Sequence, residues 1–108
     1  MTYKPGDLVL VAFPYASGAQ AKRRPALVIL DTGDADVLVA RVTTQVIRTP
    51  FDLSLKNWKA AGLRMPSTVR LHKLATLEKT LVIARLGSLS STDHQSVSAI
   101  MRQTYSSW

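Results

Sequence analysis

Three consecutive cations, Lys22, Arg23 and Arg24, stand immediately before a proline and form a patch of positive charge the size of a phosphate group. Pro25 has a fixed φ and biases the residue before it toward an extended backbone, so Arg24 is the most constrained of the three. The preceding loop contains Gly18, whose conformational freedom would let the loop close over a ligand. This pattern favours an anion-binding site, although a solvated basic turn between two strands would contain the same residues.

Residues 36–48 predict a long strand that carries a row of polar side chains. Val, Thr and Ile recur through this segment, as is typical of strands. Because successive side chains of a strand point to opposite faces, Arg41, Thr43 and Gln45 share one face. Such a row offers a polar working surface, and it would also suit an ordinary sheet edge facing solvent.

A second polar row is predicted in the strand of residues 68–74. Here the apolar residues point one way, while Arg70 and His72, two residues apart, point the other. Arginine binds phosphate and histidine exchanges protons near neutral pH, so the pair suits phosphate chemistry or general acid–base catalysis. A solvated polar face would contain the same pair.

Together these segments predict a cationic site for a phosphodiester. Guanidinium and ammonium groups bind phosphate and stabilise charge that builds on its non-bridging oxygens. RNA carries its own nucleophile, the neighbouring 2′-hydroxyl, so an enzyme that cuts RNA needs in-line positioning, proton transfer and anion stabilisation rather than a protein nucleophile or a metal. The candidate catalytic residues are Arg24, Thr43, Arg70 and His72, and the candidate RNA-binding residues are Gly18, Gln20, Lys22, Arg23, Arg41, Gln45 and Lys73.

Several other chemistries lack their residues in this chain. It contains no cysteine, and its two histidines, His72 and His94, are far apart in sequence, so a structural zinc site is not expected. The seven acidic residues are scattered, with no evident carboxylate pair for glycoside or two-metal phosphoryl chemistry. No glycine motif of the nucleotide-binding type is present. We therefore expect neither a metal nor another cofactor.

Composition indicates one small folded domain with an affinity for polyanions. The 108 residues, 46% of them hydrophobic, predict a single domain over residues 1–108. A net charge of +7 favours nucleic acid, an acidic protein segment or, less strongly, an anionic membrane as the partner. No apolar run is long enough to span a membrane and no signal-peptide pattern begins the sequence, so we expect a cytoplasmic protein.

The elements that must position these residues are mostly strands. Apolar runs at residues 7–13 and 26–30 are too short for helices and predict strands buried on both faces. A last strand is predicted at residues 81–86, where Gly87 ends it. With the two polar strands, these predict a mainly β fold: a small, strongly curved antiparallel sheet or barrel, closed by a C-terminal helix.

Two helices are expected. Ser54 would cap a short helix over residues 55–61 that stops at Gly62, with its tryptophan as a packing anchor. The C-terminal helix is predicted over residues 91–105, after a sequence that resembles a capping box with Asp in place of Glu. One apolar stripe of this helix would lie on the sheet: Val97, Ile100, Met101 and Tyr105.

Four short sequence blocks stand in a fixed order along the chain. They are KPGD at 4–7 before an apolar strand, RPALVI at 24–29 after a small-residue loop, VTTQ at 42–45, and VRL at 69–71 continuing through ATLEK at 75–79 to LGSLS at 86–90. In order and rough spacing they resemble the MazF/PemK/Kid family of bacterial toxins from toxin–antitoxin systems. The Arg-Pro block before a Val/Ile strand is the most specific of the four.

This resemblance implies an SH3-like barrel of the PemK/CcdB type, a homodimer, and a metal-independent endoribonuclease that cuts single-stranded RNA at short sequences. It also implies a cognate antitoxin whose acidic C-terminal segment lies across the RNA groove, which suits a net charge of +7. By position, Arg24 matches the family's loop arginine at the scissile phosphate. Thr43 matches a strand threonine of the site, and Arg70 matches a further active-site arginine.

The chain departs from the family pattern in three places. His72 stands where some members have an acidic residue proposed to transfer a proton, and we hypothesise that the imidazole takes such a role here. Gly18 and Ala19 stand where family loops often carry Glu or His, and Ala75 stands where an arginine is common. The phosphate-binding cations therefore match the family, whereas its general acid and base do not carry over.

Two other functions are open on the sequence alone. A non-catalytic toxin on the same fold, such as a DNA-gyrase poison similar to the CcdB toxins, would have the same overall shape. A plain nucleic-acid-binding barrel would use the same charge through salt-dependent backbone contacts. Arg24, Thr43 and Arg70 argue against a gyrase poison, which needs no phosphate-binding group. Whether bound RNA stays intact separates both functions from a ribonuclease.

Overall fold

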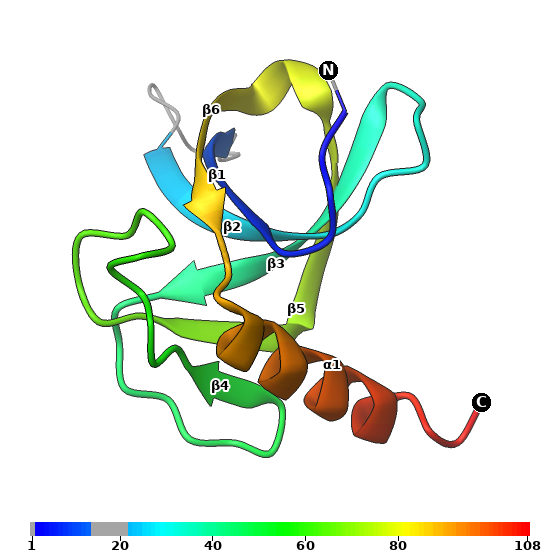
Figure 1. Ribbon diagram of the computed structural model, residues 1–108. Coiled ribbons are helices and arrows are strands. Elements are labelled where there is room, and N and C mark those ends of the chain that lie inside the picture. Colours follow the sequence, from blue (N-terminus) through cyan, green and yellow to red (C-terminus); the bar gives the residue numbers. More distant parts are fainter. Residues whose placement is uncertain (1, 14–21) are drawn as a thin grey trace.

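A single antiparallel sheet dominates the computed structural model, which describes residues 2–13 and 22–108 (Figure 1). Its six strands lie in the order β4-β5-β3-β2-β1-β6. A 3₁₀ turn, η1 (Lys79–Leu81), precedes the last strand, and the helix α1 (Ser91–Thr104) follows it. The predicted mainly β fold with a C-terminal helix is confirmed. The strands are β1 (Asp7–Phe13), β2 (Lys22–Leu30), β3 (Asp36–Thr43), β4 (Asp52–Ser54), β5 (Thr68–Glu78) and β6 (Val82–Ser88).

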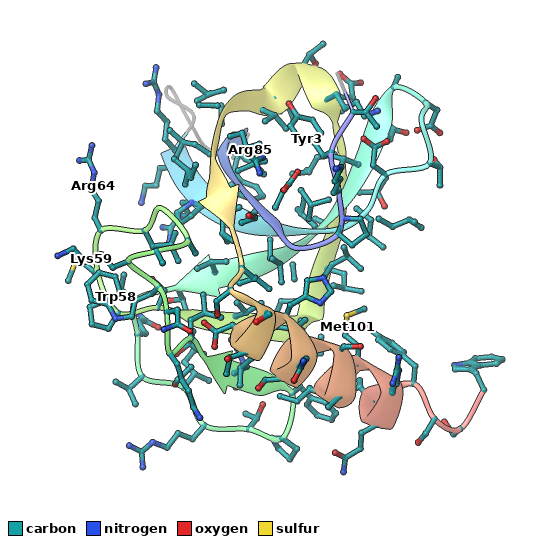
Figure 2. The ribbon with its side chains drawn as sticks, in the orientation of Figure 1. Tyr3, Trp58, Lys59, Arg64, Arg85 and Met101 are labelled. Atoms are coloured by element: carbon teal, nitrogen blue, oxygen red, sulfur yellow. The ribbon has the colours of Figure 1, made fainter. Side chains whose placement is uncertain are left out.

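Alternate residues of the central strands enter two apolar clusters, one on each face of the sheet. In β1, Leu8 belongs to one cluster and Val9 to the other, which confirms the prediction of a strand buried on both faces. The helix-side cluster lies against α1 and consists of Leu8, Leu27, Ala40, Val42, Leu55, Ala61, Leu63, Val69, Leu71 and Val97. The inner cluster fills the curl of the sheet (Figure 2) and consists of Tyr3, Val9, Val11, Ala26, Val28, Val37 and Val39.

β2 begins at Lys22, four residues before the predicted start at residue 26. The strand is longer because its first residues pair with the end of β1, with Arg24 opposite Val11. Pro25 therefore lies inside the strand, where its missing N–H costs little because β2 pairs with β3 only from Ala26 onward. Arg24 is held by a strand pairing as well as by the proline.

Other strand ends also differ from the predicted ones. β3 ends at Thr43 instead of residue 48, and β5 continues to Glu78 because it pairs with β3 as far as Asp36. β6 passes through Gly87 and ends at Ser88. The three-residue strand β4, which pairs with β5 at the edge of the sheet, has no counterpart among the predicted elements.

The prediction of a helix over residues 55–61 is wrong, because this segment forms a series of turns. Ser54, its predicted cap, is the last residue of β4. The carboxylate of Asp93 instead accepts hydrogen bonds from the backbone N–H groups of Lys56 (3.0 Å) and Asn57 (2.8 Å). The side chain of Asp93 from α1 therefore accepts hydrogen bonds from the backbone N–H groups that Ser54 was predicted to cap.

Gly62 ends these turns with a φ of +91°, the left-handed conformation predicted for it. A Cβ at this position would collide with the backbone carbonyl of Leu86, so the turns pack directly on the backbone of β6. Trp58, labelled in Figure 2, packs from the same turns against the helix-side cluster. This confirms that Trp58 is a packing residue.

α1 packs its apolar stripe on the sheet as predicted. Ser90 caps the helix, since its side chain accepts a hydrogen bond from the Asp93 N–H at 3.2 Å. The carboxylate half of the predicted capping box is absent, because both oxygens of Asp93 bind the turns. The Tyr105 hydroxyl donates to the Leu71 carbonyl at 3.3 Å. Within residues 2–13 and 22–108 no helix is long and apolar enough to cross a membrane.

Replacing Asp93 by Ala is expected to destabilise the fold by about 2–4 kcal/mol, because two backbone N–H groups lose their acceptor in a part-buried site. The measurement is the free energy of unfolding from urea titration. Gln95→Ala, an exposed change on the same helix, is the control and is expected to shift it by no more than about 0.5 kcal/mol. Equal stability of the two variants would show that Asp93 does not hold the turns.

Candidate active site

Two adjoining hollows share Arg24, Pro25 and Arg41 in their walls, and we call them together the cationic hollow. The first has a volume of about 270 Å³, and Arg24, Arg41 and Lys73 line it together with apolar side chains such as Phe13 and Val39. The second has a volume of about 250 Å³ and a more polar wall, which includes Thr43, Thr44, Gln45 and Ser67. Positive charge above an apolar floor suits an anionic ligand that carries an apolar ring or sugar.

Strand register brings these residues together. β2 and β3 pair Ala26 with Arg41, and the same register continued by two residues sets Arg24 opposite Thr43. Gln45 lies beyond the end of β3, yet it lines the hollow because its N–H donates to Thr43 Oγ1 at 3.1 Å in a tight turn. Five predicted site residues therefore line one cationic hollow: Arg24, Arg41, Thr43, Gln45 and Lys73.

Arg24 carries a buried donor without a partner. Its Nε is one of two buried side-chain polar atoms in the described chain that make no hydrogen bond, and the other is Nδ1 of His72. Buried polar atoms are almost always paired, so an orphan in a cationic wall indicates a place that a ligand's acceptor would fill. A phosphate oxygen is such an acceptor.

Arg70 lies beside the cationic hollow but does not line it. Its register partner on β3 is Arg41 and its register partner on β4 is Asp52, so the three residues form a row across three strands. The Nε of Arg70 donates to Asp52 Oδ1 at 3.1 Å. This ion pair is partly buried, with 18% of the Arg70 side chain and 2% of the Asp52 side chain exposed.

The Asp52 carboxylate is held in its charged form. Burial raises its pKa, but hydrogen bonds from the Thr49 hydroxyl (2.7 Å), Arg70 and the Thr49 backbone N–H (3.1 Å) outweigh burial and lower the pKa from its usual 3.8. The carboxylate therefore stays negative at neutral pH beside a group of cations.

His72 lies apart from the cationic hollow. Its ring rests against Phe51, with 5.1 Å between the ring centroids and 50° between the ring planes. The buried Nδ1 has no partner, whereas Nε2 is not among the buried unpaired atoms of the described chain. His72 therefore packs on Phe51 outside the lining of the cationic hollow, and its role in proton transfer stays a prediction.

The remaining predicted site residues lie at or before the start of β2. Lys22 and Arg23 are exposed and pair with the end of β1, and neither lines the cationic hollow. Gly18 and Gln20 lie outside the described residues. Arg23 and Lys22 are therefore neighbours of the site rather than parts of its wall.

Three residues near the site were not predicted: Thr49, Phe51 and Asp52. They lie in the segment between β3 and β5, which has no alternation or motif that would indicate a polar site. The available signal was weak, because an acidic residue two positions after Pro50 most often belongs to a solvated turn. Their place depends on the pairing of β4 with β5.

Solved structures share this fold over nearly the whole chain. A MazE–MazF structure from Deinococcus radiodurans superposes with a TM-score of 0.78 at 18% identity and covers 98% of each chain. An endoribonuclease in complex with its cognate antitoxin from a mycobacterial species has a TM-score of 0.75 at 16% identity, covering 94% of this chain and 92% of that one. Toxin MazF-mt6 from Mycobacterium tuberculosis has a TM-score of 0.71 at 18% identity, covering 91% and 96%.

Comparison by sequence gives a family but no individual relative. No curated protein matches the sequence. A family model described as the PemK-like, MazF-like toxin of type II toxin–antitoxin systems matches residues 4–105, which include every strand, α1 and the whole cationic hollow. The chain therefore belongs to the PemK-like, MazF-like family of toxins.

Proposed function

We propose that this chain is a sequence-selective endoribonuclease that cleaves single-stranded RNA as the toxin of a type II toxin–antitoxin pair. The observation that carries the proposal is the buried, unpartnered Nε of Arg24 in a wall shared with Arg41 and Lys73. Three cations around one hollow fit a phosphodiester better than a neutral ligand. Family membership and the likeness to structures described as endoribonucleases support the same activity.

The proposed reaction uses the nucleophile of RNA itself. The 2′-hydroxyl oxygen forms a bond to the adjacent phosphorus while the bond to the 5′-oxygen breaks, which leaves a 2′,3′-cyclic phosphate and a free 5′-hydroxyl. One proton leaves the 2′-hydroxyl and one is delivered to the departing 5′-oxygen. The protein must hold the phosphate in line, stabilise the charge that grows on its non-bridging oxygens, and exchange these two protons, none of which requires a metal.

The placement of the cations supports the proposed phosphate-binding roles. Arg24 and Arg41 bind the non-bridging oxygens of the scissile phosphate, and Arg70 approaches from the next strand. The Oγ1 of Thr43 accepts from the Gln45 N–H, so its hydroxyl proton is left to donate to the same phosphate. The remaining candidates bind adjoining nucleotides: Gly18, Gln20, Lys22, Arg23, Gln45 and Lys73.

His72 is the proposed proton-transfer group. Phe51 packs against the imidazole, Nδ1 is buried, and Nε2 is the nitrogen proposed to exchange a proton. Imidazole is the side chain whose charge changes near neutral pH, so it can serve as an acid or a base under physiological conditions. For His72 to act, the RNA must extend beyond the cationic hollow to the imidazole beside Phe51.

The proposed partners are polyanions and a second copy of the chain. A cognate antitoxin with an acidic segment would cover the cationic hollow and block RNA by competing for the same cations. Structures of relatives described as toxin–antitoxin complexes support this partner. A homodimer and a cytoplasmic location are further parts of the proposal, and family membership supports them.

Replacing Arg24 by Ala is expected to slow RNA cleavage by about 100- to 1,000-fold, because one donor to the developing oxyanion is lost. The assay uses a mixed single-stranded RNA with EDTA present and identifies the fragment ends. Wild-type protein should give discrete fragments that end in a cyclic phosphate. Arg102→Ala, on α1 and outside the cationic hollow, is the charge-matched control and should cleave normally.

If the wild-type protein binds RNA and leaves it intact, the proposed ribonuclease activity is rejected, whereas RNA binding by the cationic fold is supported. The non-catalytic toxin and the nucleic-acid-binding barrel would then be the functions to test. Cleavage that disappears with EDTA and returns with a divalent cation would reject the metal-independent reaction alone.

Replacing His72 by Ala is expected to lower the cleavage rate by about 100- to 10,000-fold and to remove one limb of the pH–rate profile, since a general acid or base is lost. The measurement is the single-turnover rate across neutral pH. His94→Ala, on α1, is the matched control and should keep both limbs. A His72→Ala profile that follows the wild-type profile at every pH would remove His72 from the mechanism.

A further inference from the structure

A buried carboxylate stands beside a site that is otherwise cationic. Only 2% of the Asp52 side chain is exposed, and each of its oxygens has a partner. Oδ1 accepts from Arg70 Nε at 3.1 Å, and Oδ2 accepts from the Thr49 hydroxyl at 2.7 Å and the Thr49 N–H at 3.1 Å. Thr49 therefore anchors one side of the carboxylate while the other side faces Arg70.

This contact occupies the Nε edge of the Arg70 guanidinium and leaves its two terminal amino groups without a hydrogen bond to the described residues. Nε binds Asp52, and this is the one hydrogen bond that the Arg70 side chain makes within residues 2–13 and 22–108. Neither terminal amino group of Arg70 is a buried unpaired atom, and 18% of the side chain is exposed. A guanidinium held at Nε presents its two terminal amino groups as a fork that matches two phosphate oxygens.

The same row explains how two arginines can stand side by side. Arg41 and Arg70 are register partners on neighbouring strands, and like charges in that position repel each other. Asp52 is the register partner of Arg70 on its other side. The carboxylate therefore attracts Arg70 toward β4 and offsets part of its charge, which lowers the repulsion between the two arginines.

We propose that Asp52 is a positioning residue for RNA cleavage: anchored by Thr49, it holds Arg70 so that the terminal amino groups face the scissile phosphate opposite Arg41. This inference rests on the proposed function and deepens it. Asp52 itself does not touch the RNA. Its effect passes through the orientation of one arginine.

Loss of a positioning residue changes RNA binding and RNA cleavage differently from loss of a residue that only stabilises the fold. A negative charge next to the phosphate site opposes RNA binding, so removing it should strengthen binding. The same removal releases Arg70 from its fixed orientation, so cleavage should slow. A structural defect would weaken binding and cleavage together, whereas loss of positioning moves them in opposite directions.

The test compares Asp52→Asn with the wild-type protein on two RNAs. One is cleavable, and the other carries a 2′-deoxy sugar at the cleavage position, so it binds without reacting. Asp52→Asn is expected to slow single-turnover cleavage roughly 10- to 100-fold while binding the 2′-deoxy RNA as tightly as wild type or roughly 2- to 5-fold more tightly. Unchanged cleavage, or parallel losses of binding and cleavage, would overturn the inference.

Asp7→Asn is the matched control. Asp7 is also a buried carboxylate with an arginine partner, Arg85, at 3.2 Å, and its other oxygen accepts a backbone N–H, that of Lys4. The change removes the same unit of charge at the junction of β1 and β6, away from the cationic hollow. Asp7→Asn should cleave at the wild-type rate, and an equal loss in both variants would overturn a specific role for Asp52.

A second pair of variants serves if Asp52→Asn does not fold. Thr49→Val removes the hydroxyl that anchors Asp52 and should slow cleavage roughly 3- to 10-fold, whereas Thr49→Ser keeps it and should cleave normally. Equal cleavage rates for the Thr49→Val and Thr49→Ser variants would overturn the inference. Failure of the proposed function is distinguishable, because the wild-type protein itself would then leave the cleavable RNA intact.

Discussion

A register shift within β5 is the constraint on which the rest of the site depends. β3 pairs Ala40 with Leu74 but its next residue, Arg41, with Arg70, so residues 71–73 have no partner on β3. Three extra residues are an odd number, and the face to which odd-numbered side chains of β5 point is therefore reversed across the shift. Before it they enter the helix-side cluster, and after it they pack against the inner cluster. One irregularity thus lets a single strand serve both clusters and turns its cations toward two different surroundings.

The cost of this arrangement is electrostatic, and the two apolar clusters make it tolerable. Arg24, Arg41 and Lys73 surround one hollow, and Arg70 stands directly opposite Arg41. In a loop such charges would move apart, but here their strands are fixed by pairing on the sheet and by burial on both faces. Asp52 offsets the charge of Arg70, and within residues 2–13 and 22–108 the other three cations have no ion-pair partner. Binding of a polyanion is therefore favoured twice, by direct contacts and by relief of repulsion among groups that are already in place.

Sequence alternation predicts those parts of the molecule that local geometry determines. The C-terminal helix and the face that Arg41 and Thr43 share follow from it, because each depends on which side of an element a side chain takes. Prediction fails where the decisive partner is distant in sequence. The turns at residues 55–61 need Asp93 from α1, and the ion pair of Asp52 needs Arg70 from β5. The capping propensity of Ser54 could not indicate either contact.

The shift in β5 also changes which polar side chains of this strand line the cationic hollow. Strict alternation over residues 68–74 would put Arg70 and His72 together on one face and turn Lys73 away. In the structure Lys73 lines the cationic hollow, while His72 packs on Phe51 beside the row formed by Asp52 and Arg70. Lys73 and His72, neighbours in sequence, therefore have different surroundings. Because His72 does not line the cationic hollow, its proposed role requires an RNA that extends beyond the hollow to the imidazole beside Phe51.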